Sequence, residues 1–354
     1  MDSLPELTTS RALLTTGTLG AVLAIAAMFG LFSKNHFPVE GRTILITGAS
    51  EGMGRSVAVQ LAAKGAHVIL VSRNVGRLEE ALLEVQAAAA SPSTQRFTYI
   101  SADVSEPDYA ARVVAEAIAW NGGRPLDTVW CVAGMSTPLL FTDPGAMAAS
   151  HRNMSVNYFG AAEMAHAILR EWLTPPSGTT TTKWPEPKHL IFTSSVAALL
   201  PLVGYAPYTP SKSALRGLAD TLAMELHLYP DTPVKVHVVF PATIVSPGFA
   251  RENETKPGVT VELEKADTPE TPETVARRAV AGLERGEYFV TTSFLGWLMR
   301  CGALGSSGRN SWVLDTVVAW VMSVAYFFVM WDLNGQVARW GRTHGTPTPG
   351  KKAV

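Results

Sequence analysis

The segment TILITGASEGMG, residues 43–54, decides the fold of this chain. It begins with a short β-rich run, and an apolar helical pattern follows over residues 52–64. Glycines between a strand and a helix let the backbone approach a pyrophosphate, whose charge then sits against the N–H groups and the positive end of the helix. This strand-turn-helix unit therefore predicts a dinucleotide site that includes Gly48, Ser50, Glu51, Gly52 and Gly54.

Beyond this unit, β-rich runs and helical patterns alternate over residues 41–292. Strands are expected at Thr43–Thr47, His67–Val71, Phe97–Ser101, Thr128–Val132, His189–Thr193 and Val234–Phe240. Helices are expected at Gly52–Lys64, Val75–Ala87, Asp108–Trp120, Pro144–Trp172 and Tyr208–Tyr229. This alternation predicts an α/β fold, a single Rossmann-type, doubly wound parallel sheet.

Two segments interrupt the alternation. Leu173–Lys188 is rich in Thr and Pro, which is typical of a surface insertion, and Thr243–Thr271 is a long connection rich in Pro, Glu and Thr. Long connections in compact domains often act as lids. We therefore expect the second segment to cover the site.

The composition is that of a folded domain with apolar ends. Of the 354 residues, 47% are hydrophobic and 17% charged, so the chain can bury a full core. The 29 basic and 30 acidic residues are interspersed, which argues against a nucleic-acid-binding protein. Cys131 and Cys301 lie far apart without a CxxC or Cys/His cluster. We therefore expect no metal site and no disulfide framework, and a reducing compartment is the default.

The first apolar end, residues 12–33, contains 22 residues without a charge, and a helix needs about 20 to cross a hydrocarbon core. We expect a membrane anchor within residues 1–40. The rival interpretation, a secretory signal peptide, lacks an evident cleavage site before Lys34. The basic residues that follow, Lys34 and Arg42, weakly favour a cytosolic body.

The second apolar end is Ser293–Trp331, within an expected membrane-associated segment at 293–335. Its longest uncharged run, Thr316–Trp331, has 16 residues, or about 24 Å of helix, against a hydrocarbon core of roughly 30 Å. Four interpretations stay open: an imperfect span, half of a hairpin, an interfacial helix, or a buried helix of the domain. A polar tail follows at 336–354 and should be disordered after Thr343.

The residues after the second and third strands bear on the choice of cofactor. An acid after the second strand would bind the ribose of NAD and repel a 2′-phosphate, whereas this chain has Arg73 there, with Arg77 close behind. The sequence therefore favours NADPH. Asp103, after the third strand, either hydrogen-bonds the adenine or caps the next helix.

A proton-transfer group is expected at the start of the helix after the fifth strand. Tyr208 and Lys212 are four residues apart, so the phenol and the ammonium share one helix face. An adjacent ammonium favours the phenolate and lowers the pKa of the phenol. Ser195, at a strand end, could hydrogen-bond the same substrate oxygen, with Ser194 as the alternative. Asn157 could hold a water that links the lysine to solvent, or be a satisfied buried amide.

These motifs together resemble the short-chain dehydrogenase/reductase family over residues 41–292. The glycine motif, Asp103, Asn157, Ser195 and the Tyr208-(x)3-Lys212 pair carry the resemblance. It implies a nicotinamide cofactor and a catalytic tetrad. In that tetrad the serine polarises a carbonyl, the tyrosine donates the proton, the lysine also holds the nicotinamide ribose, and the asparagine supports a proton relay.

Two positions depart from the family pattern. The usual Asn-Ala-Gly after the fourth strand is Val132-Ala133-Gly134 here, which puts in doubt a hydrogen bond that supports the sheet. NADP-binding members often carry a basic residue within the glycine motif, where this chain has Glu51. The NADPH prediction therefore depends on Arg73.

Within this family, the segment FPATIVSPGFAREN, residues 240–253, resembles the 3-ketodihydrosphingosine reductase subfamily. The resemblance implies NADPH-dependent reduction of 3-ketosphinganine, a long-chain 3-keto sphingoid base, to sphinganine in sphingolipid biosynthesis. It also implies an endoplasmic reticulum membrane enzyme whose catalytic domain faces the cytosol, and it places Ile244 and Ser246 near the nicotinamide carboxamide. By analogy with the family, a homo-oligomer would pair through the two long helices.

Two other functions compete with this interpretation. The first is a membrane-bound reductase of another lipid ketone, such as a steroid, a retinoid or acyl-dihydroxyacetone phosphate. The second is a non-catalytic nucleotide-binding membrane module, which would have no need of the Tyr208 and Lys212 pair.

Overall fold

The computed structural model describes residues 34–174, 184 and 186–345. The predicted N-terminal anchor, most of the predicted surface insertion and the final residues from 346 lie outside that part of the chain.

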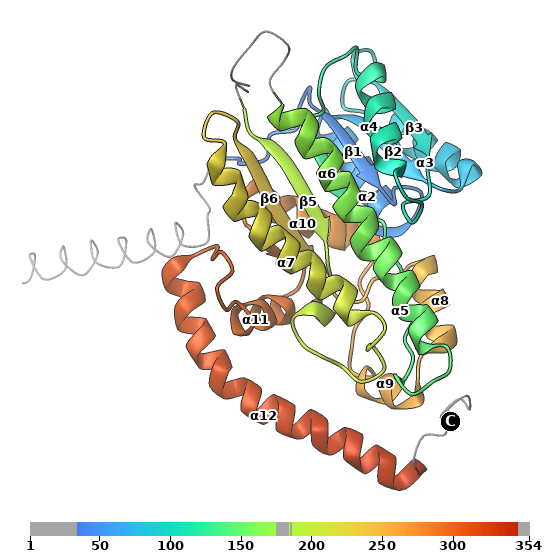
Figure 1. Cartoon of the computed structure of the whole chain (residues 1–354), viewed down its shortest axis with the longest axis vertical. Coiled ribbons are helices and arrows are strands. Elements are labelled where there is room, and N and C mark those ends of the chain that lie inside the picture. Colours follow the sequence, from blue (N-terminus) through green and yellow to red (C-terminus); the bar gives the residue numbers. More distant parts are fainter. Residues whose placement is uncertain (1–33, 175–183, 185, 346–354) are drawn as a thin grey trace, which may run out of the picture.

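Seven parallel strands form one sheet in the order β3-β2-β1-β4-β5-β6-β7 (Figure 1). They are β1 Thr43–Thr47, β2 His67–Ser72, β3 Phe97–Ser101, β4 Thr128–Cys131, β5 Lys188–Thr193, β6 Val234–Phe240 and β7 Phe289–Thr291. The strand order changes direction between β1 and β4, and such a switch point opens a crevice at the carboxyl ends of the strands. The predicted α/β class and single parallel sheet are confirmed.

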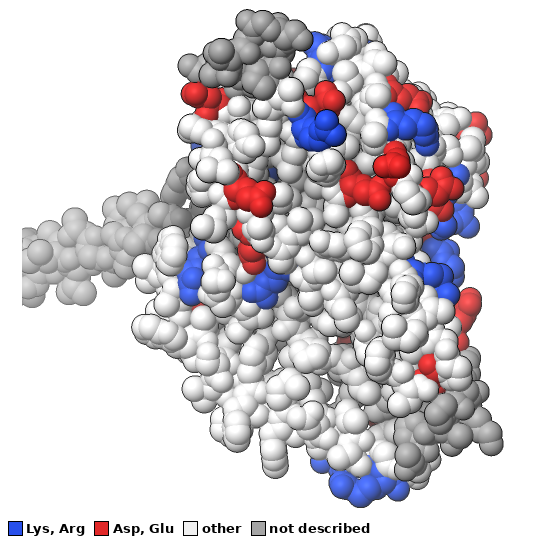
Figure 2. Space-filling view, viewed as in Figure 1, with Lys and Arg blue, Asp and Glu red and all other residues white. Residues whose placement is uncertain are grey.

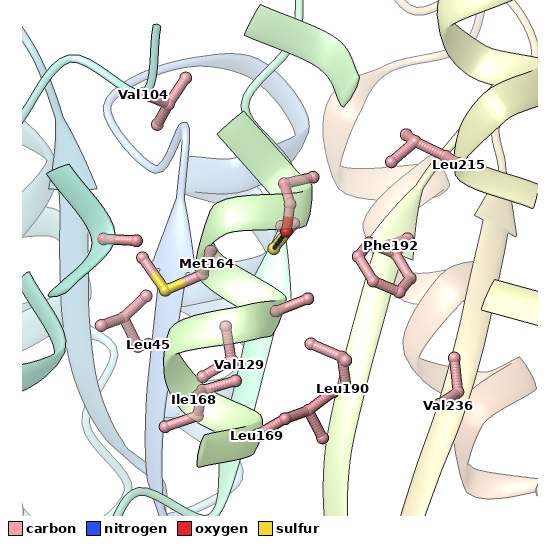
Figure 3. Packing of buried hydrophobic residues seen from close by; sticks show 14 of the residues in the cluster. Leu45, Val104, Val129, Met164, Ile168, Leu169, Leu190, Phe192, Leu215 and Val236 are labelled. Atoms are coloured by element: carbon pink, nitrogen blue, oxygen red, sulfur yellow. Dashed lines mark hydrogen bonds between the residues drawn. The ribbon is translucent and has the colours of Figure 1, made fainter. Parts of the chain in front are cut away.

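Helices cover both faces of the sheet because successive strand residues point to opposite sides. On one face lie α4 (Tyr109–Trp120), α6 (Gly160–Leu173) and α7 (Thr209–Glu225), and on the other lie α2 (Gly52–Ala63), α3 (Val75–Ala87) and α10 (Pro272–Glu284). Figure 3 shows the first core, where Met164, Ile168 and Leu169 of α6 approach strand residues such as Leu45, Val129 and Leu190. Ile44 and Ile46 belong to the opposite core.

The observed elements follow the predicted ones closely, with a few informative differences. The six predicted strands are present with ends shifted by at most one residue, while β7 was not predicted. The predicted helix at 144–172 is divided into α5 (Ala146–Asn153), a π-helical turn at Met154–Phe159, and α6. The long connection at 243–271 contains two helices, α8 (Pro247–Thr255) and α9 (Gly258–Leu263).

The C-terminal part forms α11 (Phe294–Gly302) and α12 (Trp312–His344), which runs along the lower edge of the molecule in Figure 1. α12 has 33 residues, or about 50 Å. Its most apolar 18-residue window has a mean hydropathy of 1.9, and only 6% of that window is buried. By length and composition this helix could cross a membrane, and it is the single such helix among the described residues. The interpretation of a buried domain helix was therefore wrong, and α12 also continues through the predicted start of the polar tail at Gln336.

A buried ion pair attaches α12 to the domain. Arg300 of α11 donates to both carboxylate oxygens of Asp315 at 2.9 and 2.8 Å, and the two side chains are 1% and 2% exposed. Farther along, the Tyr326 hydroxyl donates to the Met299 carbonyl at 2.9 Å. The acid that interrupts the apolar run in sequence is thus neutralised by a partner, which explains why the helix extends past it.

Candidate active site

A cavity of about 1520 Å³ opens at the carboxyl ends of the strands. It extends from the loop after β1 to α11 and α12. Of the predicted site residues, all but Asn157 line it: Gly48, Ser50, Glu51, Gly52, Gly54, Arg73, Arg77, Asp103, Ser195, Tyr208, Lys212, Ile244 and Ser246. The structure therefore brings the predicted cofactor and catalytic residues to one place.

The glycine loop is tightly packed behind its open face. Gly48 has a φ of +71°, and a Cβ there would lie 2.6 Å from the backbone of Ala133. A Cβ on Gly54 would lie 2.2 Å from the Gly48 carbonyl oxygen. Only glycine fits both positions, and the first turn of α2 consequently presents its free N–H groups to the cavity. This cradle fits the pyrophosphate of a dinucleotide.

The predicted cofactor arginines form ion pairs within the protein. Arg73 is 72% exposed and lies 3.3 Å from Asp103, while Arg77 lies 2.5 Å from Glu51. Arg251 of α8 also reaches Glu51, at 2.6 Å, so this acid joins the lid to the glycine loop. The arginines therefore already face carboxylates at the cavity rim, where an anionic group would compete for them.

Asp103 does not cap a helix. Its carboxylate accepts hydrogen bonds from the backbone N–H and the hydroxyl of Ser105 at 2.9 and 2.7 Å, and α4 begins only at Tyr109. Burial works against ionisation, but the Ser105 hydrogen bonds and the Arg73 charge hold the pKa of Asp103 below its ordinary value. The capping alternative was wrong, and an ionised acid remains at the rim.

Tyr208 and Ser195 form the proposed proton-transfer pair. The hydroxyl of Ser195 acts on the Tyr208 phenol and lowers its pKa, and it accepts a hydrogen bond from the Ala197 N–H at 3.2 Å. Ser194 is buried and donates its hydroxyl to the Lys212 carbonyl at 2.8 Å. The side chain of Ser194 is thus engaged with α7, which leaves Ser195 beside the phenol.

Burial dominates the titration of this pair. It raises the pKa of Tyr208 above its ordinary value, the Ser195 hydrogen bond acts in the opposite direction, and the Glu252 carboxylate adds to the rise. Burial also lowers the pKa of Lys212 to about 8. Lys212 Nζ donates to the Thr193 carbonyl at 2.9 Å and lies 5.9 Å from the centre of the Tyr208 ring. The predicted lowering of the phenol pKa is therefore wrong for this state, and the Tyr208 phenol is protonated at neutral pH.

Asn157 lies on the π-helical turn, behind the cavity wall. Its carbonyl oxygen accepts from the Met135 N–H at 2.8 Å, and its amide donates to the Met135 carbonyl and the Ser211 hydroxyl, each at 2.9 Å. The structure thus has the satisfied buried amide; the water-holding role stays a prediction. A Cβ on Gly134 would lie 3.1 Å from Lys212 Nζ and 3.3 Å from Asn157 Oδ1, so a glycine here lets the two side chains converge.

Val132 stands where the family usually has the asparagine of Asn-Ala-Gly, and backbone N–H groups make the hydrogen bonds between β1 and β4 there. Val132 N–H donates to the Thr47 carbonyl at 3.2 Å, and Ala133 N–H donates to the Thr47 hydroxyl at 3.3 Å. The strands β1 and β4 therefore stay connected at their carboxyl ends without an asparagine side chain.

Ile244 and Ser246 lie where the chain leaves β6 for the lid. Ile244 forms an isolated bridge with Glu270, and the Ser246 hydroxyl accepts from the Phe249 N–H at 3.2 Å to cap α8. Both residues line the cavity near Gly52, whose added Cβ would lie 3.5 Å from the Ser246 Cβ.

A comparison with protein families decides the classification: the family described as short chain dehydrogenase matches residues 42–257. The chain belongs to this family. It is 65% identical over 348 residues to the 3-ketodihydrosphingosine reductase gsl-3 of Neurospora crassa, covering 98% of this chain and 95% of that protein. It is 43% identical over 343 residues to the 3-ketodihydrosphingosine reductase ksrA of Aspergillus fumigatus, covering 94% of this chain and 93% of that protein.

A solved structure extends the comparison to three dimensions. The short-chain type dehydrogenase/reductase of Mycobacterium ulcerans superposes with a TM-score of 0.57 at 27% identity, covering 70% of this chain and 84% of that protein. The short-chain dehydrogenase fold is thus shared, and the remainder of this chain adds segments to it.

In this short-chain dehydrogenase, a polar cluster that the sequence did not reveal lies beside Tyr208. The Tyr205 hydroxyl contacts the carboxylates of Glu252 at 2.6 Å and Glu264 at 2.8 Å. Lys256 is 4% exposed and lies 3.1 Å from Glu252 and 2.6 Å from Glu264. Two carboxylates therefore share one ammonium, which leaves an excess negative charge in the cavity wall. Only the four-residue spacing from Glu252 to Lys256 was visible in sequence.

Proposed function

We propose that this chain is an NADPH-dependent 3-ketodihydrosphingosine reductase, which reduces 3-ketosphinganine to sphinganine in sphingolipid biosynthesis. The observation that carries the proposal is one cavity that joins Tyr208 and Lys212 to the apolar helices α11 and α12. Similarity to reductases of that name over nearly the whole chain supports the same substrate. A long-chain ketone needs both a proton donor and an apolar wall.

The glycine loop and the residues after β2 and β3 would hold the cofactor. The N-terminus of α2 would face the pyrophosphate, Asp103 the adenine, and Arg73 with Arg77 the 2′-phosphate. Arg73 supports NADP over NAD because no acid follows β2 to bind a free ribose hydroxyl. When bound, the reduced nicotinamide supplies a hydride to the ketone carbon.

The chain's own residues supply the proton. Ser195 and Tyr208 would donate hydrogen bonds to the ketone oxygen, and Tyr208 would transfer its proton there as the carbon is reduced. The ammonium of Lys212, close behind, stabilises the phenolate that this step leaves. Asn157 holds the Met135 backbone and Ser211 in place, and a proton relay through it is part of the proposal.

Two carboxylates in the cavity wall, Glu252 and Glu264, would bind the amine of the substrate head. The ketone of a sphingoid base lies next to an amine, which is a cation at neutral pH. The excess negative charge of Glu252 and Glu264 over Lys256 would attract that cation. Because Glu252 also raises the pKa of Tyr208, a bound ammonium would offset this effect and favour proton donation.

The decisive experiment assays the purified protein in detergent with NADPH and a panel of ketones. We expect turnover of long-chain 3-keto sphingoid bases, and much less with steroids, retinoids or acyl-dihydroxyacetone phosphate. Nucleotide binding without turnover of any ketone would support the non-catalytic module instead.

We also propose that the enzyme lies on the endoplasmic reticulum membrane with the catalytic domain in the cytosol. Two glycosylation sequons test the orientation, because glycans are added only in the lumen. Asn153 is fully buried and donates to the Pro207 carbonyl, so it is not a usable acceptor, whereas Asn253 is exposed on α8. A glycan on Asn253 would contradict the cytosolic orientation.

A further inference from the structure

The catalytic cavity has a second, apolar end. Beyond Tyr208 it is lined by Leu295 and Met299 of α11 and by Val329 and Leu333 of α12. Leu263 of α9 also lines it, and α9 contacts α12. Helices far along the chain from the glycine loop therefore complete the same cavity that contains the proton donor.

One face of α12 is directed toward the domain along much of the helix. Its inward positions are Asp315, Met322, Tyr326, Val329 and Leu333, spaced as one stripe of a helix. The first three attach the helix to the domain, through the Arg300 ion pair, a buried methionine and the hydrogen bond to Met299. The last two face the cavity, and Val329 is 38% exposed. The same face of α12 thus contacts the domain over Asp315–Tyr326 and lines the cavity at Val329 and Leu333.

The opposite face of α12 is apolar and exposed. Trp320, Val324, Phe327, Phe328 and Trp331 are between 61% and 73% exposed. Figure 2 shows that the lower part of the molecule is largely free of charge, with basic side chains at the far end of this helix. Tryptophan-rich apolar faces next to basic residues are typical of helices that lie in a membrane interface.

The contacts at both ends of the helix determine how it meets a membrane. α12 is held to α11 near its start and contacts α9 near its other end, so it lies alongside the domain instead of leading away from it. A helix held in this way can insert only its outer face. Among the interpretations left open by the sequence, the contacts favour the interfacial helix.

We infer that α12 is the wall between the lipid and the active site: its outer face lies in the membrane, and Val329 and Leu333 on its inner face bind the alkyl chain of the ketone. The chain enters from the bilayer between α9, α11 and α12, so it need not cross water on the way to Tyr208. The inference rests on the proposed function, since the occupant is the hydrocarbon tail of a sphingoid ketone.

The test changes the inner and outer faces separately. Val329→Trp and Leu333→Trp add bulk to the inner face, and Val324→Trp is the matched control on the outer face. Each variant is assayed with a long-chain 3-keto sphingoid base in phosphatidylcholine vesicles and with a soluble short-chain analogue that has the same amino-ketone head. We expect both inner variants to lower kcat/KM for the long-chain ketone about tenfold and to leave the short-chain ketone within about twofold, and the control to match the wild type.

Four outcomes would overturn the inference. Inner variants that behave like Val324→Trp would place the alkyl chain elsewhere, and an equal loss with both ketones would assign these residues to the head or to the fold. If the tryptophan variants do not fold, Leu333→Ala replaces them, and an unchanged preference for long chains would contradict the inference. The last outcome is equal quenching of tryptophan fluorescence by brominated lipids in the wild type and in Trp331→Phe, because the exposed Trp331 on the outer face would then not lie in lipid. This readout is local to α12 and does not depend on the anchor expected within residues 1–40. A wild-type protein that reduces neither ketone would instead refute the proposed function.

Discussion

The two ends of the cavity are built in different ways. The cofactor end is formed by the turns that follow β1, β2 and β3, so its residues are fixed by backbone packing such as the contact of Gly54 with the Gly48 carbonyl. The substrate end is formed by α8, α9, α11 and α12, which buried ion pairs such as Arg300 with Asp315 hold in place. In the proposed function, cofactor binding thus depends on turns fixed by the sheet, while the choice of substrate depends on helices that can vary without altering the sheet.

The largest effect should come from the residue between the two ends. Tyr208→Phe removes the transferable proton, so we expect kcat to fall about a thousandfold. NADPH binding should be unchanged, because the cofactor end is intact, and fluorescence titration of NADPH checks this. Turnover near the wild-type rate would show that another group donates the proton.

Breaking the ion pair that holds the substrate end should cost stability. Asp315→Asn leaves the Arg300 charge buried without a counter-ion, and we expect a loss of about 3 kcal/mol in the free energy of unfolding. Chemical denaturation in detergent measures it, with the exposed Asp332→Asn on the same helix as the control. NADPH affinity that falls together with stability would contradict the independence of the two ends.

A substitution of Glu252 can remove the recognition of the substrate ammonium and leave the apolar wall of the substrate end unchanged. Glu252→Gln should raise KM for the amino ketone about tenfold, because a charge-assisted hydrogen bond to the ammonium is lost. An analogue without the amine should show no such change. Glu262→Gln, on the exposed side of α9, is the control, and equal effects of the two substitutions would rule out this recognition.

An effect of similar size should lie at the exposed rim of the cofactor end. Arg73→Glu would repel a 2′-phosphate and shift the preference from NADPH toward NADH, by about tenfold in the ratio of kcat/KM values. KM for the ketone should stay the same. A ratio that does not move would assign the 2′-phosphate to other residues, with Arg77 the first to examine.

The cofactor end was predictable from sequence because each of its parts is local. A β-rich run, three glycines and an apolar helix lie within about twenty residues, so one strand-turn-helix unit could be recognised without the rest of the fold. The strand β7 was not predicted because its three residues, Phe289–Thr291, are too few to show an alternating pattern.

The substrate end was not predictable because its contacts join distant parts of the chain. Tyr205, Glu252 and Glu264 come from three separate segments, and nothing in their spacing indicates that they meet. In the sequence, the charge of Asp315 interrupts an apolar run, and only the fold shows that Arg300 neutralises it. The titration of Tyr208 likewise depends on how deeply the fold buries it, which the spacing to Lys212 does not reveal.

The π-helical turn at Met154–Phe159 gives the long helix a phase shift. The side chains of α5, before the turn, are therefore rotated about the helix axis relative to those of α6, after it. This rotation lets α6 direct Met164 into the core. Removing any single residue from this turn would wind it into ordinary helix and rotate the residues ahead of the deletion by about 100° relative to α6. A deletion of Tyr158 or Phe159, which spares every proposed site residue, would therefore still turn the Asn157 amide away from Met135 and Ser211.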